Sequence, residues 1–434
     1  MPQALIESLS PAVVASLILA ALLLAHLWLK LWLASRQIRA VARHRDRVPA
    51  EFSSSISLSS HQRAADYTVA RLRFGLIEAA LGAVVLLGWT LLGGLDWLNG
   101  ALLNLMGARP LWQPLALLMA FSVINGIIDL PASLYQTFVI EQRFGFNKMT
   151  FGLWLIDLFK STLVSVIIGV PLAALALWLM SVTGDGWWLW TWGLLTVFFL
   201  SMLVIYPMFI APLFNRFQPL QDQTLKERVT QLMSRCGFSA QGLYVMDGSR
   251  RSAHANAYFT GFGAAKRVVF FDTLLTRLTP PEVEAVLAHE LGHFKHRHIV
   301  KHIIALFAFS LLGLALLGWL ARQDWFYTGL GVTPNLPAAM GGTVPNYALA
   351  LLLFALTAPV LGFFLWPVMA RWSRQREFEA DAYAAAQSSA QDLSRALIKL
   401  HQDNASTLTP DPVYARFYYS HPPASERMAR LHIQ

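Results

Sequence analysis

Long apolar stretches recur along the chain, separated by shorter polar segments. A helix needs about 20 mostly apolar residues to cross the hydrocarbon layer, because each residue adds only about 1.5 Å to its length. Seven stretches reach this length, at 11–34, 75–98, 111–139, 161–182, 187–211, 299–320 and 347–370. A soluble core helix accounts for one such run but not for seven, so the pattern predicts a polytopic membrane protein.

The composition agrees with this pattern. Of 434 residues, 56% are hydrophobic and only 14% are charged, whereas soluble domains average about 25% charged residues. A single cysteine, Cys236, excludes an intramolecular disulfide framework, a Cys-based zinc site and an iron–sulfur cluster held by one chain. We therefore expect a protein embedded in the lipid bilayer whose chemistry depends on other side chains.

The basic residues gather on one side of the predicted membrane. If residues 35–74 are cytoplasmic, the alternation of spans places three further segments on the same side, at 140–160, 212–298 and 371–434. Of the 34 Lys and Arg residues, only Arg109 and Arg322 then lie on the other side. The positive-inside rule therefore predicts an outer N-terminus and a cytoplasmic C-terminus. This topology accounts for the net charge of +9, and we expect no nucleic-acid partner.

This topology divides the chain into four parts. Residues 1–211 carry five spans, 212–298 form a cytoplasmic segment, 299–370 carry two spans, and 371–434 form a second cytoplasmic segment. The two cytoplasmic segments are long enough to fold together. Residues 220–236 have helical periodicity, and strands are expected at 243–245 and on both sides of the turn 261–263, at 256–260 and 267–272. The sequence thus predicts an α+β cytoplasmic domain beside an all-helical membrane part.

The first cytoplasmic segment contains a metal-binding pattern, HELGH. Residues 279–282 (TPPE) predict a helix start with a capping box, and the helix continues through the motif. The i, i+4 spacing puts His289 and His293 on one helix face, where both can bind one zinc ion, and Glu290 beside them suits a general base. The alternative is a juxtamembrane helix whose histidines lie among lipid headgroups, a role for which three others are candidates: His296, His298 and His302.

A catalytic zinc needs a third protein ligand and an open position for water. Glu377 and Asp381 share one face of a predicted helix, which suits a carboxylate ligand and a second carboxylate that orients a ligand histidine. The alternative is a solvated acidic face paired with Arg374 or Arg376. Glu379 projects elsewhere and is expected at the surface.

A further histidine, His421, precedes Pro422, which holds it in an extended conformation just before a short predicted helix. Such a histidine could donate a hydrogen bond to an oxyanion. The pattern fits an ordinary loop histidine as well.

At these motifs the chain closely resembles the CAAX prenyl protease 1 family, which are zinc endopeptidases of the membrane. The matching stretches are 61–67 (HQRAADY), 138–147 (FVIEQRFGFN), 205–207 (IYP), 210–214 (IAPLF), 252–262 (SAHANAYFTGF), 289–293 (HELGH), 377–381 (EFEAD) and 420–427 (SHPPASER). The resemblance implies an all-α-dominated membrane protein. Seven long helices would enclose a water-filled chamber, and an α+β metalloprotease domain would close its cytoplasmic side.

The resemblance also implies a role for each motif residue. One Zn²⁺ per chain would be bound by His289, His293 and Glu377, with Glu290 as the catalytic base. Asp381 would orient a ligand from behind, and His421 would stabilise the transition state. Residues from the strand beside the site would pair with an extended peptide substrate, with an arginine near the cleft: Asn256, Ala257, Tyr258 and Arg427.

Short loops and the lack of an endoplasmic-reticulum retrieval signal lead us to expect a bacterial member in the cytoplasmic membrane, with prenylated or CAAX-like peptides or misfolded membrane proteins as substrates. Two alternatives stay open. An intramembrane-cleaving metalloprotease would place the motif inside a span, whereas His289 precedes the sixth span here. A transporter or scaffold would use the chamber and keep a vestigial metal site.

Overall fold

The computed structural model describes residues 10–239, 242–260, 267–334 and 346–433, most of which are helical. Seven helical segments among them are long and apolar enough to cross a membrane. They are α2 (Pro11–Arg43), α3 (Leu58–Trp89), Trp112–Glu141 with α5 (Trp112–Tyr135), α6 (Phe151–Val182), Gly184–Phe214 with α7 (Trp187–Ile205) and α8 (Ala211–Phe214), α12 (His298–Leu320) and α14 (Tyr347–Gln387). The predicted seven-helix membrane fold is therefore confirmed.

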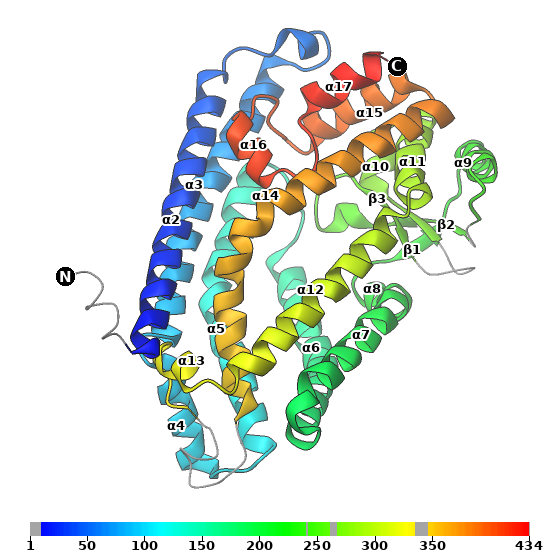
Figure 1. Ribbon diagram of the computed structural model, residues 1–434. Helices are drawn as coiled ribbons and strands as arrows, with labels where there is room; N and C mark the ends of the chain where they lie inside the picture. The colour runs from blue at the N-terminus through cyan, green and yellow to red at the C-terminus, as the bar shows by residue number, and fades with distance from the viewer. Residues whose placement is uncertain (1–9, 240–241, 261–266, 335–345, 434) are drawn as a thin grey trace.

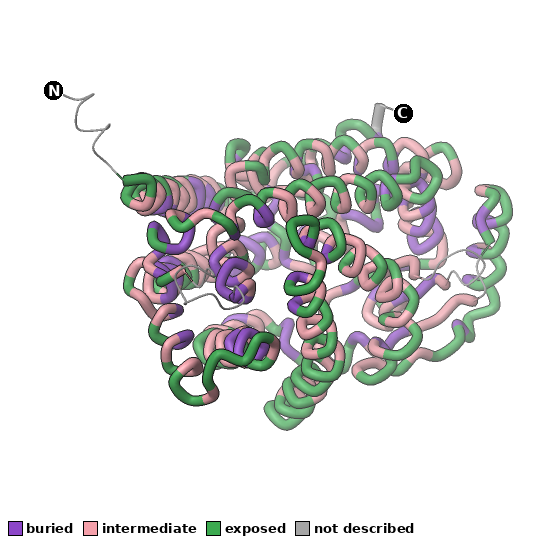
Figure 2. The backbone as a smooth tube through the Cα atoms, turned by 60° about the horizontal axis from the view of Figure 1, so that its bottom comes forward, coloured by how far each residue is buried: buried purple, intermediate pink, exposed green. Residues whose placement is uncertain are grey.

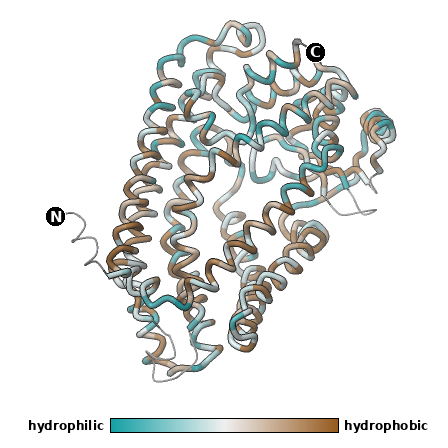
Figure 3. Tube along the Cα trace, in the orientation of Figure 1, coloured by the Kyte–Doolittle hydropathy of each residue, from teal (hydrophilic) through white to brown (hydrophobic). Residues whose placement is uncertain are grey.

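The outer surfaces of these helices are apolar. Exposed large side chains include Leu17, Leu24 and Trp28 of α2, together with Ile304 and Leu312 of α12. Figure 2 shows exposed positions running along the long helices, and Figure 3 shows these helices as largely hydrophobic, with more polar residues at the end that carries the C-terminus. Apolar surface of this extent marks the part of the molecule that faces lipid.

The second membrane helix ends earlier than the hydropathy predicts. The apolar stretch predicts a span at 75–98, but α3 ends at Trp89 and a separate helix, α4 (Gly94–Met106), follows. Gly93 lies between them with φ at 77°, a left-handed conformation that glycine adopts without steric strain. Hydropathy does not register this break, because the residues on both sides of it are apolar.

The seventh membrane helix continues well beyond the bilayer-length stretch at 347–370. Helix α14 runs without interruption for 41 residues, although Pro359 and Pro367 lie inside it and each removes a backbone hydrogen-bond donor. Figure 1 shows α14 extending from the end near α13 (Asp324–Thr328) to the end that carries the C-terminal helices. The seventh span and the acidic motif predicted after it therefore belong to one continuous helix.

The polar end contains a four-stranded sheet in the order β1-β2-β4-β3. The strands are β1 (Phe217–Pro219), β2 (Gly242–Met246), β3 (Ala257–Thr260) and β4 (Arg267–Phe271). β2 and β4 are parallel, and the other two pairs are antiparallel. The three predicted strands are confirmed, β1 was not expected, and the predicted turn at 261–263 lies outside the described residues. Among the described residues β3 is an edge strand, so one of its sides has no partner strand there.

Helices cover this sheet and form a core with it. They are α9 (Gln223–Arg235), α10 (Asp272–Leu275), α11 (Pro280–Lys295), α15 (Ala390–Asp403) and α17 (Ala424–Ile433), whereas α16 (Pro412–Tyr418) packs against α14 and α2 instead. One core cluster joins Leu287 of α11, Phe270 of β4, Leu232 of α9 and Leu393 of α15. The predicted α+β arrangement is thus present, with α11 at its centre.

Helix α11 begins with the predicted capping box and lies very close to α14. The Thr279 side chain accepts from the helix backbone, and Glu282 accepts from the Thr279 backbone nitrogen at 2.8 Å. A Cβ atom on Gly292 would lie 2.9 Å from Cα of Ala380, which is closer than packed atoms tolerate. The glycine within the HELGH motif therefore permits the close approach that brings the two predicted metal-binding helices together.

Candidate metal centre

His289 and His293 of α11 meet Glu377 of α14, and each offers a ligand atom within 4.8 Å of the other two. The two histidine Nε2 atoms lie 3.2 Å apart. Nε2 of His289 is 3.4 Å from Oε2 of Glu377, and Nε2 of His293 is 3.4 Å from Oε1 of the same carboxylate. The structure therefore brings together the three residues that the sequence predicts as metal ligands.

The separations and chemistry of this donor set fit a zinc ion. Tetrahedral zinc with Zn–N distances near 2.0–2.1 Å places neighbouring ligand atoms about 3.3 Å apart, close to the 3.2–3.4 Å observed. Among the described residues, Oε2 of Glu377 is buried and accepts no hydrogen bond, which is costly for a carboxylate oxygen unless a cation binds it. Two imidazoles and one carboxylate also leave a fourth position free for water or substrate.

His289 is held from behind by a buried carboxylate. Its Nδ1 lies 2.9 Å from Oδ1 of Asp381. Arg427 binds both oxygens of Asp381, at 2.8 Å through Nε and at 2.6 Å through Nη2. Asp381 is 3% exposed and Arg427 is 6% exposed. This arrangement fixes the proton of His289 on Nδ1 and directs the Nε2 lone pair toward the metal position.

The site attracts positive charge. Burial opposes protonation of His289, but the hydrogen bond to Asp381 and the nearby Glu377 carboxylate outweigh it and raise its pKa to about 9. The two carboxylates thus favour a cation at this point of the structure, as a divalent metal requires.

His293 has a different support, which the sequence reading missed. Its Nδ1 lies 3.0 Å from Nδ1 of His298, whose Nε2 lies 2.8 Å from Oε2 of Glu379. If His293 binds metal through Nε2, its Nδ1 must donate to His298, and His298 must donate in turn to Glu379. The chain of three groups therefore has one consistent assignment of protons.

The headgroup expectation for His298 is wrong, because this side chain is only 4% exposed. Glu379 was expected at the surface, and its half-exposed side chain nevertheless takes part in the chain of hydrogen bonds. Arg297 has φ at 55°, and this left-handed residue turns the backbone between α11 and α12 so that His298 lies against His293. Helical periodicity ends at Lys295, so no spacing rule predicts this contact.

Replacing His298 with Ala is expected to weaken zinc binding about tenfold to a hundredfold, because His293 then loses the group that orients it. Competition with a chromogenic chelator measures the affinity in detergent. His302→Ala provides the matched control, because His302 lies one turn further along α12 and is exposed. Equal zinc affinities for the two variants would contradict a supporting role for His298.

The remaining candidates lie around the cluster at different distances from it. Glu290 is partly exposed and makes no hydrogen bond to the described residues. Nε2 of His421 lies 3.4 Å from Oε1 of Glu377, on a side chain that is 65% exposed. Asn256 is exposed at the start of β3, and its carbonyl oxygen accepts from Phe271 of β4 at 3.0 Å. Of these three residues, His421 and Asn256 line one and the same cavity.

Ala257 and Tyr258 lie on the edge strand and are half-buried. The Tyr258 side chain lines a cavity of about 540 Å³ together with Thr260 and Arg267. Asn256, by contrast, lines a cavity of about 860 Å³ that also contains His421 and Arg427. The predicted substrate strand therefore runs between two cavities, and only the larger one includes residues that contact the metal ligands.

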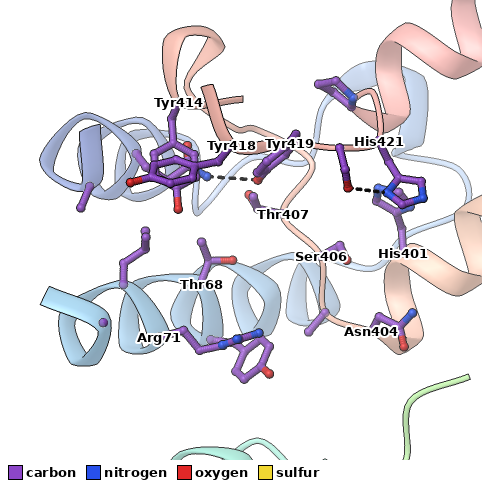
Figure 4. Close-up of a pocket in the computed structure, with 18 of the residues that line it drawn as sticks. Thr68, Arg71, His401, Asn404, Ser406, Thr407, Tyr414, Tyr418, Tyr419 and His421 are labelled. Atoms are coloured by element: carbon purple, nitrogen blue, oxygen red, sulfur yellow. Dashed lines mark hydrogen bonds between the residues drawn. The ribbon is translucent and has the colours of Figure 1, made fainter. Parts of the chain in front are cut away.

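The larger cavity separates two walls (Figure 4). Thr68 and Arg71 lie on the α3 wall, and Tyr414, Tyr418 and Tyr419 lie on the opposite wall, with His421 at one end. Further lining residues come from α2, the π-helical turn Gln136–Glu141, α15 and the segment 404–407 that follows it. A cavity enclosed by membrane helices and the C-terminal segment thus opens onto the metal cluster.

Known families match almost the whole chain. Residues 37–216 match the family described as CAAX prenyl protease N-terminal, five membrane helices, and residues 219–433 match Peptidase family M48. The chain is 37% identical to the CAAX prenyl protease 1 homolog of Arabidopsis thaliana over 78% of this chain and 79% of the relative. It is 32% identical to the CAAX prenyl protease 1 homolog of Homo sapiens over 94% of this chain and 92% of the relative.

A solved structure has the same fold. The crystal structure of S. mikatae Ste24p superposes with a TM-score of 0.88 at 32% identity, covering 96% of this chain and 99% of the other. The three residues of the metal cluster lie within the part of the chain that matches Peptidase family M48. The chain belongs to the CAAX prenyl protease 1 family of membrane metalloendopeptidases.

Proposed function

We propose that this chain is a zinc-dependent endopeptidase that cleaves extended peptide substrates on the cytoplasmic side of a bacterial cytoplasmic membrane. The observation that most supports this proposal is the cluster of His289, His293 and Glu377, which presents three ligand atoms within 4.8 Å from two helices. Because the relatives are named as CAAX prenyl proteases, prenylated or CAAX-like peptides are one proposed substrate class. Misfolded membrane proteins are the other.

The three ligands would hold one zinc ion and leave a fourth position open. A zinc ion held by these three residues would supply Lewis acidity, which polarises a substrate carbonyl and makes water a stronger acid. Asp381 and His298 would keep the two imidazole rings oriented, since each lies at hydrogen-bonding distance from the Nδ1 atom that faces away from the ligand position.

Glu290 is proposed as the general base. It follows His289 directly on α11, is partly exposed, and makes no hydrogen bond to the described residues that would occupy its carboxylate. It would take a proton from the attacking water and pass it to the nitrogen of the leaving amine. A carboxylate with no fixed partner is suited to this exchange.

His421 and the edge strand would hold the substrate. Nε2 of His421 lies 3.4 Å from Oε1 of Glu377, so a donated hydrogen bond could reach an oxyanion that forms beside the ligands. An extended peptide could add to the free side of β3 from Asn256 to Tyr258 through main-chain hydrogen bonds. Main-chain pairing of this kind selects an extended backbone more than a particular side chain.

Metal removal tests the proposal. Protein stripped with a strong chelator is expected to lose at least 100-fold of its peptidase activity, because the oxyanion and the water then lose their Lewis acid. Zinc should restore the rate at about one equivalent per chain, and elemental analysis should find the same ratio. Full activity in protein shown to be metal-free would overturn the proposal. Zinc binding without hydrolysis of any reporter peptide would instead favour a vestigial site.

A further inference from the structure

The larger cavity contains a cation that the proposed mechanism does not use. Four charged side chains, apart from histidine, are among the described residues that line it: Lys30, Arg71, Glu78 and Arg427. Arg427 is already bound to the buried carboxylate of Asp381. Arg71 forms no ion pair with any carboxylate in the part of the chain that the structure describes, and its side chain is exposed.

Arg71 is nevertheless held in place. Its guanidinium group lies over the ring of Tyr67, 5.6 Å from the ring centroid. The Tyr67 hydroxyl donates to Oε1 of Glu141 at 2.7 Å, which fixes the ring. Figure 4 shows Arg71 on the α3 wall, across the cavity from the wall that bears Tyr414, Tyr418 and Tyr419. A positioned guanidinium group facing an open space has the donor geometry to bind a carboxylate through two parallel hydrogen bonds.

The cavity begins at the reaction centre, so a group bound in it can belong to a substrate. His421 lines the cavity and lies 3.4 Å from Glu377, and Asn256 at the start of the substrate strand lines it too. A peptide lying along β3 would therefore direct one of its ends into this cavity. The Arg71 guanidinium, which pairs with no carboxylate among the described residues, favours a carboxylate beside it and disfavours an ammonium group.

We propose that Arg71 binds the C-terminal carboxylate of the peptide substrate, on the side of the scissile bond that leaves with the new amine. This inference rests on the proposed peptidase function. It gives the substrate a direction, with its chain antiparallel to β3 and its C-terminus beyond Asn256.

Two internally quenched peptides test the proposal, identical in sequence except for a C-terminal carboxylate or carboxamide. The wild type is expected to cleave the acid with a kcat/KM about tenfold to a hundredfold higher, the range for one charge-assisted hydrogen-bonded contact. Arg71→Gln should lower kcat/KM for the acid peptide to the value for the amide peptide, and should leave kcat/KM for the amide peptide unchanged. The retained amide activity shows that the variant is folded, and Arg71→Lys should recover part of the preference.

Arg267→Gln is the matched control, since Arg267 lies over the Tyr244 ring at 5.3 Å in the smaller cavity. This variant should keep the full preference for the acid peptide. If Arg267→Gln lost the preference and Arg71→Gln kept it, the substrate C-terminus would lie in the smaller cavity and the proposal would be wrong. A carboxamide peptide ending in Glu distinguishes the source of the charge. If that peptide regained the acid rate, the group bound would be an acidic side chain and the assignment to the C-terminus would be wrong.

The failure of this inference can be told apart from the failure of the proposed function. Equal cleavage of acid and amide by the wild type would overturn the role of Arg71 and leave the peptidase proposal intact. No cleavage of either peptide by zinc-loaded wild type would overturn both.

Discussion

Glu290→Gln is expected to lower kcat for a reporter peptide about a thousandfold, within the range of about 10²–10⁴ for the loss of a general base. Glutamine keeps the size of the side chain and can still hold water by a hydrogen bond, but it cannot accept and return a proton. Glu290 is not a member of the ligand cluster, so the variant should bind zinc as the wild type does. Steady-state kinetics and metal analysis on the same preparation measure both quantities.

The control for this variant is Glu227→Gln, which removes an exposed carboxylate from α9 and should leave kcat unchanged. Wild-type turnover by Glu290→Gln would exclude the residue as the base. Loss of zinc together with activity would show that Glu290 supports the metal site, which would also contradict the proposed role.

The second large effect is expected from breaking the buried ion pair of Asp381 and Arg427. Arg427→Met should destabilise the folded protein by about 3–5 kcal/mol, because it leaves the Asp381 carboxylate buried without its partner. Zinc affinity should fall as well, since Asp381 orients His289 at 2.9 Å. Thermal unfolding in detergent and chelator competition measure the two effects. The exposed pair Arg45–Asp66 is the comparison, and Arg45→Gln should leave the unfolding temperature nearly unchanged, because solvent screens an exposed ion pair.

A double variant separates charge burial from lost packing. Asp381→Asn combined with Arg427→Met removes both charges, so it should be less destabilised than Arg427→Met alone. Additive effects of the two substitutions would show that the residues do not act as a pair.

The membrane fold could be read from the sequence because it depends on length and hydropathy, which are local properties. The seven apolar stretches became seven membrane helices, and the helix start at Thr279 was equally local. The features that the sequence did not predict depend on backbone geometry. The break at Gly93 requires a positive φ that hydropathy does not encode, and β1 has only three residues, Phe217–Pro219, too few for any periodicity.

The residues of the metal site likewise fall into those that the sequence predicts and one that it does not. The i, i+4 spacing predicted that His289 and His293 share a face, and resemblance supplied Glu377 as their partner from another segment. His298 could not be found by spacing, because the left-handed residue Arg297 breaks the helix between it and His293. Its role depends on two side chains brought together by a turn, and a contact of this kind is visible only in three dimensions.

The continuity of α14 restricts how this sequence can change in evolution. Glu377 and Asp381 are positioned by the same uninterrupted helix that crosses the membrane from Tyr347. One inserted residue between the bilayer and Glu377 would turn both carboxylates about 100° around the helix axis and shift them about 1.5 Å along it. Residues in this stretch can therefore be exchanged for others among homologues, but we expect its length to be invariant, whereas loops such as 46–57 can gain or lose residues.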